Sequence, residues 1–206
     1  MIKTVIFDIG GVLTDFRWRQ FFIDTGYDQE IIDRIIKATV MQPDWAEYDR
    51  GVMSEEEVLD AFCKNDPEIA TQIKECLSNI ENLVTREAYA IPWVKSLKNR
   101  GYQVLYLSNF SRKAHEDCIG ALDFIPYTDG GILSYMDHVI KPEKEIYELL
   151  MSRYNLVPEE CVFIDDTEKN LVTAKELGME TIHFTSKEQA MSDLEKLLWR
   201  DMENLE

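Results

Sequence analysis

The chain has 206 residues, of which 45% are hydrophobic, so it can bury a sizeable core as one domain or as one domain with an inserted subdomain. Its formal net charge of −17 argues against nucleic acid or an anionic membrane surface as a partner. The chain starts with strand-like residues instead of a secretory signal, has no apolar run that could span a bilayer, and carries four scattered cysteines, which together predict a reducing, cytoplasmic setting.

The first predicted element is a buried strand that ends in an acid. The segment from Thr4 to Phe7 is apolar or β-branched, Asp8 follows it, and Gly10 and Gly11 come shortly afterwards. A carboxylate beside apolar residues is costly to bury unless a cation or hydrogen bonds compensate, and glycines let the backbone approach whatever the acid faces. The motif therefore predicts a catalytic or metal-binding aspartate on a turn between a strand and a loop.

Residues 15–87 contain no convincing strand and are predicted to be helical. Apolar residues recur at helical spacing over residues 28–40 and again over residues 68–84. Between these segments Ser54 is followed by three glutamates and then by apolar residues, which is the pattern of a capping box at the start of a helix. The sequence thus predicts a helical insert after the first strand.

From about residue 88 the pattern changes to alternating helix and strand. The predicted elements are a helix over residues 90–100 stopped by Gly101, a strand over 102–107, a helix over 143–153, a strand over 161–164, a helix over 168–177 stopped by Gly178, and a strand over 180–184. Such alternation predicts an α/β fold, with a mostly parallel sheet that is covered by helices on both faces.

Polar residues stand where sheets of this kind bind ligands, beyond the carboxyl ends of the strands. These positions, each at a strand end or just before a helix, are Asp8, Ser108-Asn109, Lys141 and Asp165-Asp166. Each alone has an ordinary explanation, because a Ser-Asn pair after a strand is often a helix cap and a lone lysine is usually a solvated surface residue. Their combination in this order is specific and predicts a single site.

These motifs resemble those of the haloacid dehalogenase-like hydrolase superfamily, and the resemblance extends over the whole chain. The segments that carry it are Phe-Asp-Ile-Gly-Gly-Val with Asp8, Leu-Ser-Asn with Ser108, Ile-Lys-Pro-Glu with Lys141, and Phe-Ile-Asp-Asp-Thr-Glu-Lys-Asn with Asp165-Asp166. Residues 45–58 are similar to cap segments of the sugar-phosphate phosphatase branch. The resemblance implies a Rossmann-like parallel-sheet core formed by residues 1–14 and 88–206, and an inserted all-helical cap subdomain formed by residues 15–87.

The resemblance also implies a Mg²⁺-dependent phosphomonoester hydrolase. It would act on a small phosphorylated metabolite, with sugar phosphates as candidates, through an aspartyl-phosphate intermediate. The implied residues are Asp8 as nucleophile with Lys141 for catalysis, Ser108, Asn109 and Lys141 for the phosphate, and Asp8, the Gly10 carbonyl, Asp165 and Asp166 for Mg²⁺. The chemistry is coherent, because an anionic nucleophile that attacks an anionic phosphate needs positive charge between them. We expect a small phosphorylated molecule as partner and a monomer or weak homodimer.

Gly10 departs from the pattern of many phosphatases of this family, which have an aspartate at this position as general acid and base. Without that carboxyl, one of three alternatives must hold: another group donates the proton to the leaving group, the substrate has a good leaving group, or the enzyme is slow. The candidate replacements are Asp15, Asp44, Glu47 and Asp49, although the ordinary interpretation of each is a solvated surface acid. Trp18 and Trp45 are predicted either to pack in the core or to line the substrate pocket.

Two other functions stay open. In a hydrolytic 2-haloacid dehalogenase, Asp8 would attack carbon; that chemistry needs no Mg²⁺, so the paired acids Asp165 and Asp166 count against it. A phosphometabolite-binding or regulatory protein without turnover is favoured only by Gly10. A phosphatase assay with and without Mg²⁺ separates the three functions.

Overall fold

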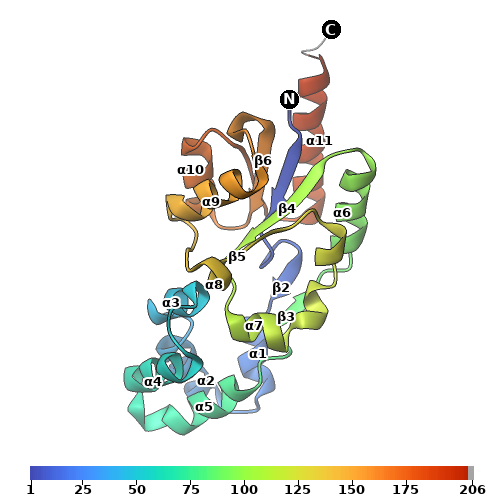
Figure 1. Cartoon of the computed structure of the whole chain (residues 1–206). Coiled ribbons are helices and arrows are strands. Elements are labelled where there is room, and N and C mark those ends of the chain that lie inside the picture. Colours follow the sequence, from blue (N-terminus) through green and yellow to red (C-terminus); the bar gives the residue numbers. More distant parts are fainter. Residues whose placement is uncertain (204–206) are drawn as a thin grey trace.

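A computed structural model describes residues 1–203 of the chain, and its larger sheet is five-stranded and parallel throughout (Figure 1). The strands are β1 (Thr4–Phe7), β4 (Gln103–Ser108), β5 (Gly131–Leu133), β6 (Cys161–Asp165) and β7 (Glu180–His183). Their spatial order is β5-β4-β1-β6-β7, so the order reverses between β1 and its neighbour β6. The α/β class predicted from the sequence is confirmed.

Helices cover both faces of this sheet, as predicted. They are α6 (Ala90–Asn99), α9 (Lys144–Tyr154), α10 (Glu168–Glu176) and α11 (Lys187–Glu203). On β1, Val5 and Phe7 belong to the apolar cluster that includes α6 and α11, whereas Ile6 belongs to the cluster that includes α9 and α10. Figure 1 shows the two helix pairs on opposite sides of the strands. Because both faces are buried, β1 is apolar along its length, which made it recognisable in the sequence.

The chain leaves the sheet after β1 and forms a group of helices beyond the carboxyl ends of the strands (Figure 1). These are α1 (Trp18–Asp24), α2 (Gln29–Ala38), α3 (Asp44–Arg50), α4 (Glu55–Asn65), the 3₁₀ turn η1 (Pro67–Ile69) and α5 (Ala70–Ser78). The predicted capping box is present: the Glu57 backbone N–H donates to the Ser54 hydroxyl at 3.2 Å, and the Ser54 backbone N–H donates to the Glu57 carboxylate at 2.8 Å. Phe22, Ile35 and Phe62 share one apolar cluster with Phe7, so the inserted helices are held against the core.

A two-stranded antiparallel ribbon joins the inserted helices to the core. It pairs β2 (Thr14–Phe16) with β3 (Val84–Arg86). The prediction that residues 15–87 contain no strand is therefore wrong. The prediction of one helical segment over residues 68–84 is also wrong, because α5 ends at Ser78. Strands of three residues are too short to show a periodicity of two. The predicted boundaries of the cap, after residue 14 and before residue 88, fall at this ribbon, and the division into two domains stays a prediction.

The rest of the chain forms short elements around the edge of the sheet. They are α7 (Arg112–Asp117), α8 (Ser134–Asp137), and the 3₁₀ turns η2 (Ile119–Leu122), η3 (Ile125–Tyr127) and η4 (Pro158–Glu160). The four cysteines are free thiols. Within residues 1–203, the helices are all too short or too polar to cross a membrane.

Candidate active site

Asp8, Asp165 and Asp166 meet at the carboxyl ends of β1 and β6, where the strand order reverses. One carboxylate oxygen from each lies within 4.8 Å of the others. Asp8 and Asp165 are buried, while Asp166 is exposed to the cavity and solvent. Three carboxylates at this distance repel one another, so the cluster needs compensating positive charge.

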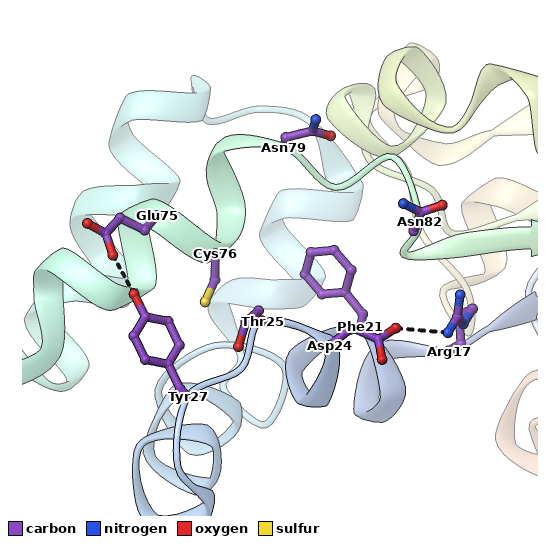
Figure 2. Close-up of a pocket in the computed structure, with 9 residues that line it drawn as sticks. All are labelled: Arg17, Phe21, Asp24, Thr25, Tyr27, Glu75, Cys76, Asn79 and Asn82. Carbon is purple, nitrogen blue, oxygen red and sulfur yellow. Dashed lines mark hydrogen bonds and ion pairs between the residues drawn. The ribbon is translucent and has the colours of Figure 1, made fainter.

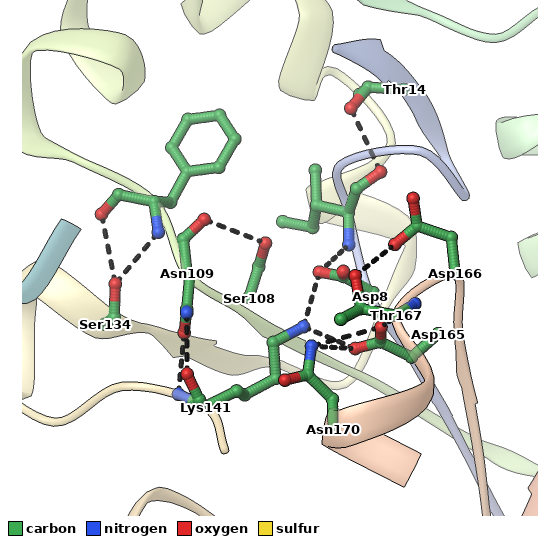
Figure 3. A network of polar contacts seen from close by, with 12 residues as sticks. Asp8, Thr14, Ser108, Asn109, Ser134, Lys141, Asp165, Asp166, Thr167 and Asn170 are labelled. Carbon is green, nitrogen blue, oxygen red and sulfur yellow. Dashed lines mark hydrogen bonds and ion pairs between the residues drawn. The ribbon is translucent and has the colours of Figure 1, made fainter. Parts of the chain in front are cut away.

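Lys141 supplies part of that charge. Its ammonium Nζ lies 2.8 Å from Asp8 Oδ1 and 2.7 Å from Asp165 Oδ2 (Figure 3). Burial alone would lower the pKa of Lys141, but the charges of the two carboxylates raise it above its ordinary value. Asn109 fixes the backbone beneath this side chain, because its amide Nδ2 donates to the Lys141 carbonyl at 3.0 Å and its Oδ1 accepts from the Lys141 backbone N–H at 2.8 Å. The lysine is therefore a charged and positioned group.

Asp165 is surrounded by hydrogen-bond donors. Its Oδ1 accepts from the Thr167 backbone N–H at 2.7 Å, and Asn170 Nδ2 lies 3.1 Å from each of its oxygens (Figure 3). Asp166 has fewer contacts: its Oδ1 accepts from the Thr167 hydroxyl at 3.2 Å, and burial together with the charge of Asp165 raises its pKa. Asp165 thus orients Lys141, whereas Asp166 offers its carboxylate to the cavity.

Asp8 holds one oxygen fixed and leaves the other available. Oδ1 contacts Lys141 and accepts from the Ile9 backbone N–H at 2.7 Å. No hydrogen bond to Oδ2 comes from any residue between 1 and 203. Burial raises the pKa of Asp8 to about 7, with Asp165 and Asp166 acting in the same direction and Lys141 opposing them. A group with one free carboxylate oxygen in this position can act as a nucleophile or as a ligand for a cation.

The carboxylates face a cavity of about 490 Å³. Of the predicted site residues, those that line it are Asp8, Gly10, Ser108, Asn109, Lys141 and Asp166. Asp165 lies behind this wall and is fully buried. Among the residues described, the Ser108 hydroxyl makes only a long contact, 3.5 Å to the Asn109 carbonyl, so it is available to a ligand. Trp18 also lines this cavity, as does Thr167, which the sequence reasoning did not single out although it directly follows the acidic pair.

Gly11 is required by both its backbone and its surroundings, which leads to a testable prediction. Its φ is +73°, and a Cβ there would collide with the Asp166 carboxylate. Gly26 has a similar φ of +79°, and a Cβ at that position would have nothing within 4 Å, so it is a matched control. Gly26→Ala should lower the unfolding free energy by about 1–2 kcal/mol from backbone strain alone. Gly11→Ala should cost about 0.5–1.5 kcal/mol more, because the Asp166 side chain must rotate away from the new methyl group.

Urea denaturation of both glycine variants measures this difference directly. Equal losses of unfolding free energy would show that Asp166 does not lie against Gly11 as described.

A second cavity, of about 550 Å³, lies among the inserted helices (Figure 2). Its charged groups are largely paired with one another: Arg17 with Asp24 at 3.1 Å, and the Tyr27 hydroxyl with Glu75. It shares no lining residue with the cavity around Asp8. The acidic cluster with its buried lysine is therefore the candidate active site.

Known proteins with similar sequences include hydrolases and a phosphatase. A family model described as haloacid dehalogenase-like hydrolase matches residues 2–178. A D-ribitol-5-phosphate phosphatase from Bacteroides thetaiotaomicron is 27% identical over 195 residues, which cover 88% of this chain and 91% of that protein. The acyl-CoA dehydrogenase family member 10 from Mus musculus is 28% identical over 95% of this chain, but the chain spans only 19% of its length.

Among solved structures, the chain is similar to a HAD family enzyme from Bacteroides thetaiotaomicron in complex with magnesium and inorganic phosphate. The TM-score is 0.70 at 24% identity, over 91% of this chain and 96% of that chain. At this identity the likeness shows a shared fold.

Proposed function

The chain belongs to the haloacid dehalogenase-like hydrolases, and we propose that it is a Mg²⁺-dependent phosphomonoesterase that forms an aspartyl-phosphate on Asp8. The observation that carries the proposal is the charge of the cluster. Its three carboxylates and the single ammonium of Lys141 leave a net charge of −2 when all are ionised. A divalent cation neutralises this excess, and without it a phosphate dianion would be repelled.

The oxygen groups at the cavity fit the preference of Mg²⁺ for a few carboxylate or carbonyl ligands completed by water and phosphate. Asp8 Oδ2 and the Asp166 carboxylate are available, and no residue between 1 and 203 donates a hydrogen bond to the Gly10 carbonyl. We therefore assign these three groups as the nearest ligands, with Asp165 supporting them and holding Lys141. When bound, Mg²⁺ supplies positive charge that screens the phosphoryl oxygens from the nucleophile.

The roles of the side chains follow from their contacts. Asp8 attacks phosphorus, Lys141 neutralises a phosphoryl oxygen, and the Ser108 hydroxyl donates a hydrogen bond to another. Asn109 positions Lys141, and its direct contact with substrate stays a prediction. The ribitol-phosphate phosphatase among the relatives, and the similar structure with magnesium and inorganic phosphate, support a small phosphorylated substrate.

Hydrolysis of a panel of sugar, polyol and aryl phosphates, with Mg²⁺ or with EDTA, tests the proposed function, with 2-haloacids assayed in parallel. We expect phosphate release that requires Mg²⁺ and no halide release. Halide release without metal would identify a dehalogenase instead. Binding of phosphorylated metabolites without turnover of any substrate would identify a non-catalytic protein.

Mg²⁺ should also stabilise the folded protein measurably. A cation that binds only the folded state adds about 2.7 kcal/mol at a concentration one hundred times its Kd, so the Tm should rise with Mg²⁺ concentration. Asp166→Asn should remove most of this rise, because it replaces a proposed ligand. Asp60→Asn is the control, since Asp60 is an exposed acid in a weak pair with Lys74 at 3.8 Å. Equal Mg²⁺ responses in both variants would contradict the assignment of Asp166.

A further inference from the structure

The backbone does not require glycine at position 10. Gly10 has no positive φ, and the nearest atom to a Cβ built on it is Phe16 Cβ at 4.0 Å. A Cβ would fit there, so neither the backbone nor a clash at Cβ explains why the carboxyl is missing from the site. A hydrolase that expels an alkoxide needs a proton at the leaving oxygen, so an acid from elsewhere in the fold has to reach the same region.

Helix α3 brings an acid from the cap to this region. The helix packs against α8 at the edge of the sheet (Figure 1). The Arg50 guanidinium forms two hydrogen bonds with the Glu143 carboxylate, at 2.8 and 2.7 Å, and the Ser134 hydroxyl donates to the Asp49 carbonyl at 2.5 Å. These contacts tie the carboxyl end of α3 to core segments that flank Lys141 and Asn109. Asp49 is therefore held at a fixed place relative to the site.

Asp49 lines a small alcove of about 70 Å³ beside the cavity of the acidic cluster. The alcove has mostly apolar walls, which include Phe16, Trp45 and Phe110. It shares Gly10, Phe16 and Asn109 with the larger cavity, so the two meet at the residue that lacks a carboxyl. An acid in this alcove therefore lies next to the position that lacks a carboxyl.

The electrostatics agree with this placement. The pKa of Asp49 is raised to about 7, mainly by desolvation in the alcove; the charge of Asp8 acts in the same direction and Lys141 opposes both. Asp8 and Lys141 are therefore near enough to influence the pKa of the Asp49 carboxyl. None of residues 1–203 donates a hydrogen bond to this carboxyl, so it is not already committed to a structural partner.

The other candidate acids have different surroundings. Asp44 accepts a hydrogen bond from Asn65 Nδ2 at 3.0 Å, and Glu47 pairs with Arg50 at 3.2 Å. Asp15 lines the larger cavity but is exposed to solvent. Of these acids, Asp49 alone combines an unpaired carboxyl, among the residues described, with a place in the alcove next to Gly10.

We propose that Asp49 is the general acid and base of the reaction, a proposal that rests on the phosphatase function above. As an Asp8 oxygen forms its bond to phosphorus, the bond to the leaving oxygen breaks, and that oxygen takes the proton of the Asp49 carboxyl. In the second step water attacks phosphorus and the Asp8–phosphate bond breaks. The Asp49 carboxylate takes the water proton, phosphate leaves, and both aspartates regain their starting forms.

The test compares leaving groups of different basicity, assayed with Mg²⁺. The substrates are 4-nitrophenyl phosphate, whose leaving group needs no proton, and a primary alkyl phosphate such as ribitol 5-phosphate. Asp49→Asn should lower kcat/KM, which reports the first step, by roughly 10²-fold or more for the alkyl ester and by less than about tenfold for the aryl ester. Its kcat should fall for both esters, because the second step is the same for each and lacks its base. The aryl rate also reports that the variant is folded. Asp44→Asn, on the same helix, should leave the ratio of the two rates unchanged.

Two further variants complete the test. Gly10→Asp in the Asp49→Asn background should restore part of the alkyl activity, since position 10 has room for a Cβ. Equal losses of kcat/KM on both esters in Asp49→Asn, no loss on either, or a selective loss of alkyl kcat/KM in Asp15→Asn instead would overturn the role of Asp49. A wild-type enzyme that hydrolyses neither ester with Mg²⁺ would overturn the phosphatase function itself, together with the role of Asp49.

Discussion

Replacing Asp8 with asparagine is expected to lower kcat for every phosphate ester by roughly 10⁴–10⁶-fold, because the amide cannot form the covalent intermediate. The side chain keeps its shape, and its Oδ1 can still accept from the Ile9 backbone N–H, which lies 2.7 Å from the carboxylate oxygen in the wild type. The loss should therefore fall on kcat and not on folding. Steady-state kinetics with the best substrate of the panel measures it, and a variant with near wild-type kcat would remove Asp8 from its role.

The same variant has a predicted effect on stability with a definite sign. The pKa of Asp8 is raised from 3.8 to about 7, so in the absence of cation its ionisation opposes folding. This cost is absent below about pH 4, where Asp8 is protonated in both states, and reaches its full size above about pH 7. In EDTA, Asp8→Asn should therefore have a higher Tm than the wild type at pH 8, and the difference should vanish toward pH 4. A lower Tm at pH 8 would contradict this.

Lys141→Met is expected to have the largest effect on stability. The side chain is almost fully buried, and its removal leaves Asp8 and Asp165 without their cation. Breaking a buried ion pair on one side costs roughly 3–5 kcal/mol, so the unfolding free energy in EDTA should fall by about that amount. Activity should fall by at least 10²–10³-fold, roughly the cost of losing one charge-stabilising donor. Urea denaturation and steady-state kinetics give the two numbers.

Lys144→Met is the matched control for this variant. Lys144 is exposed and its nearest acid, Glu176, is 3.9 Å away, so its loss should change the unfolding free energy by no more than about 0.5 kcal/mol. Mg²⁺ should recover part of the stability lost in Lys141→Met, because it returns positive charge to the cluster. Similar losses in the two lysine variants would show that Lys141 is not a buried counter-ion.

The central strands were predictable because helices bury both of their faces. Apart from Thr4 and Asp165, β1 and β6 consist of apolar residues, and their predicted bounds agree with the structure to within a residue. β5 was not predicted because it has only three residues, too few to show a pattern. It is defined by its parallel pairing with β4, in which Tyr106 lies opposite Gly131. Helix α11 was not predicted, although its sequence indicates a helix: Ala190, Leu194 and Leu198 recur at helical spacing and are buried.

The acidic cluster was predictable for a topological reason. The carboxyl ends of neighbouring parallel strands meet at one edge of a sheet, so Asp8 and Asp165 had to lie close together. The placement of Asp49 could not be predicted in this way. It depends on how α3 docks on the core, and the ion pair that fixes it joins Arg50 to Glu143, which are 93 residues apart. The sequence could only name Asp49 as one of several acids.

Phosphorylation of Asp8 is tested most directly by mass spectrometry of the intact protein, quenched with acid during turnover with Mg²⁺ and then fragmented to locate the modification. We predict a fraction of the protein heavier by one phosphoryl group, located on Asp8. The Asp49→Asn variant should accumulate more of it with an aryl phosphate, because the second step lacks its base. Asp8→Asn should show none. Two results would contradict the proposed mechanism. One is phosphate release without a phosphorylated enzyme in both the wild type and Asp49→Asn, and the other is a phosphoryl group on a residue other than Asp8.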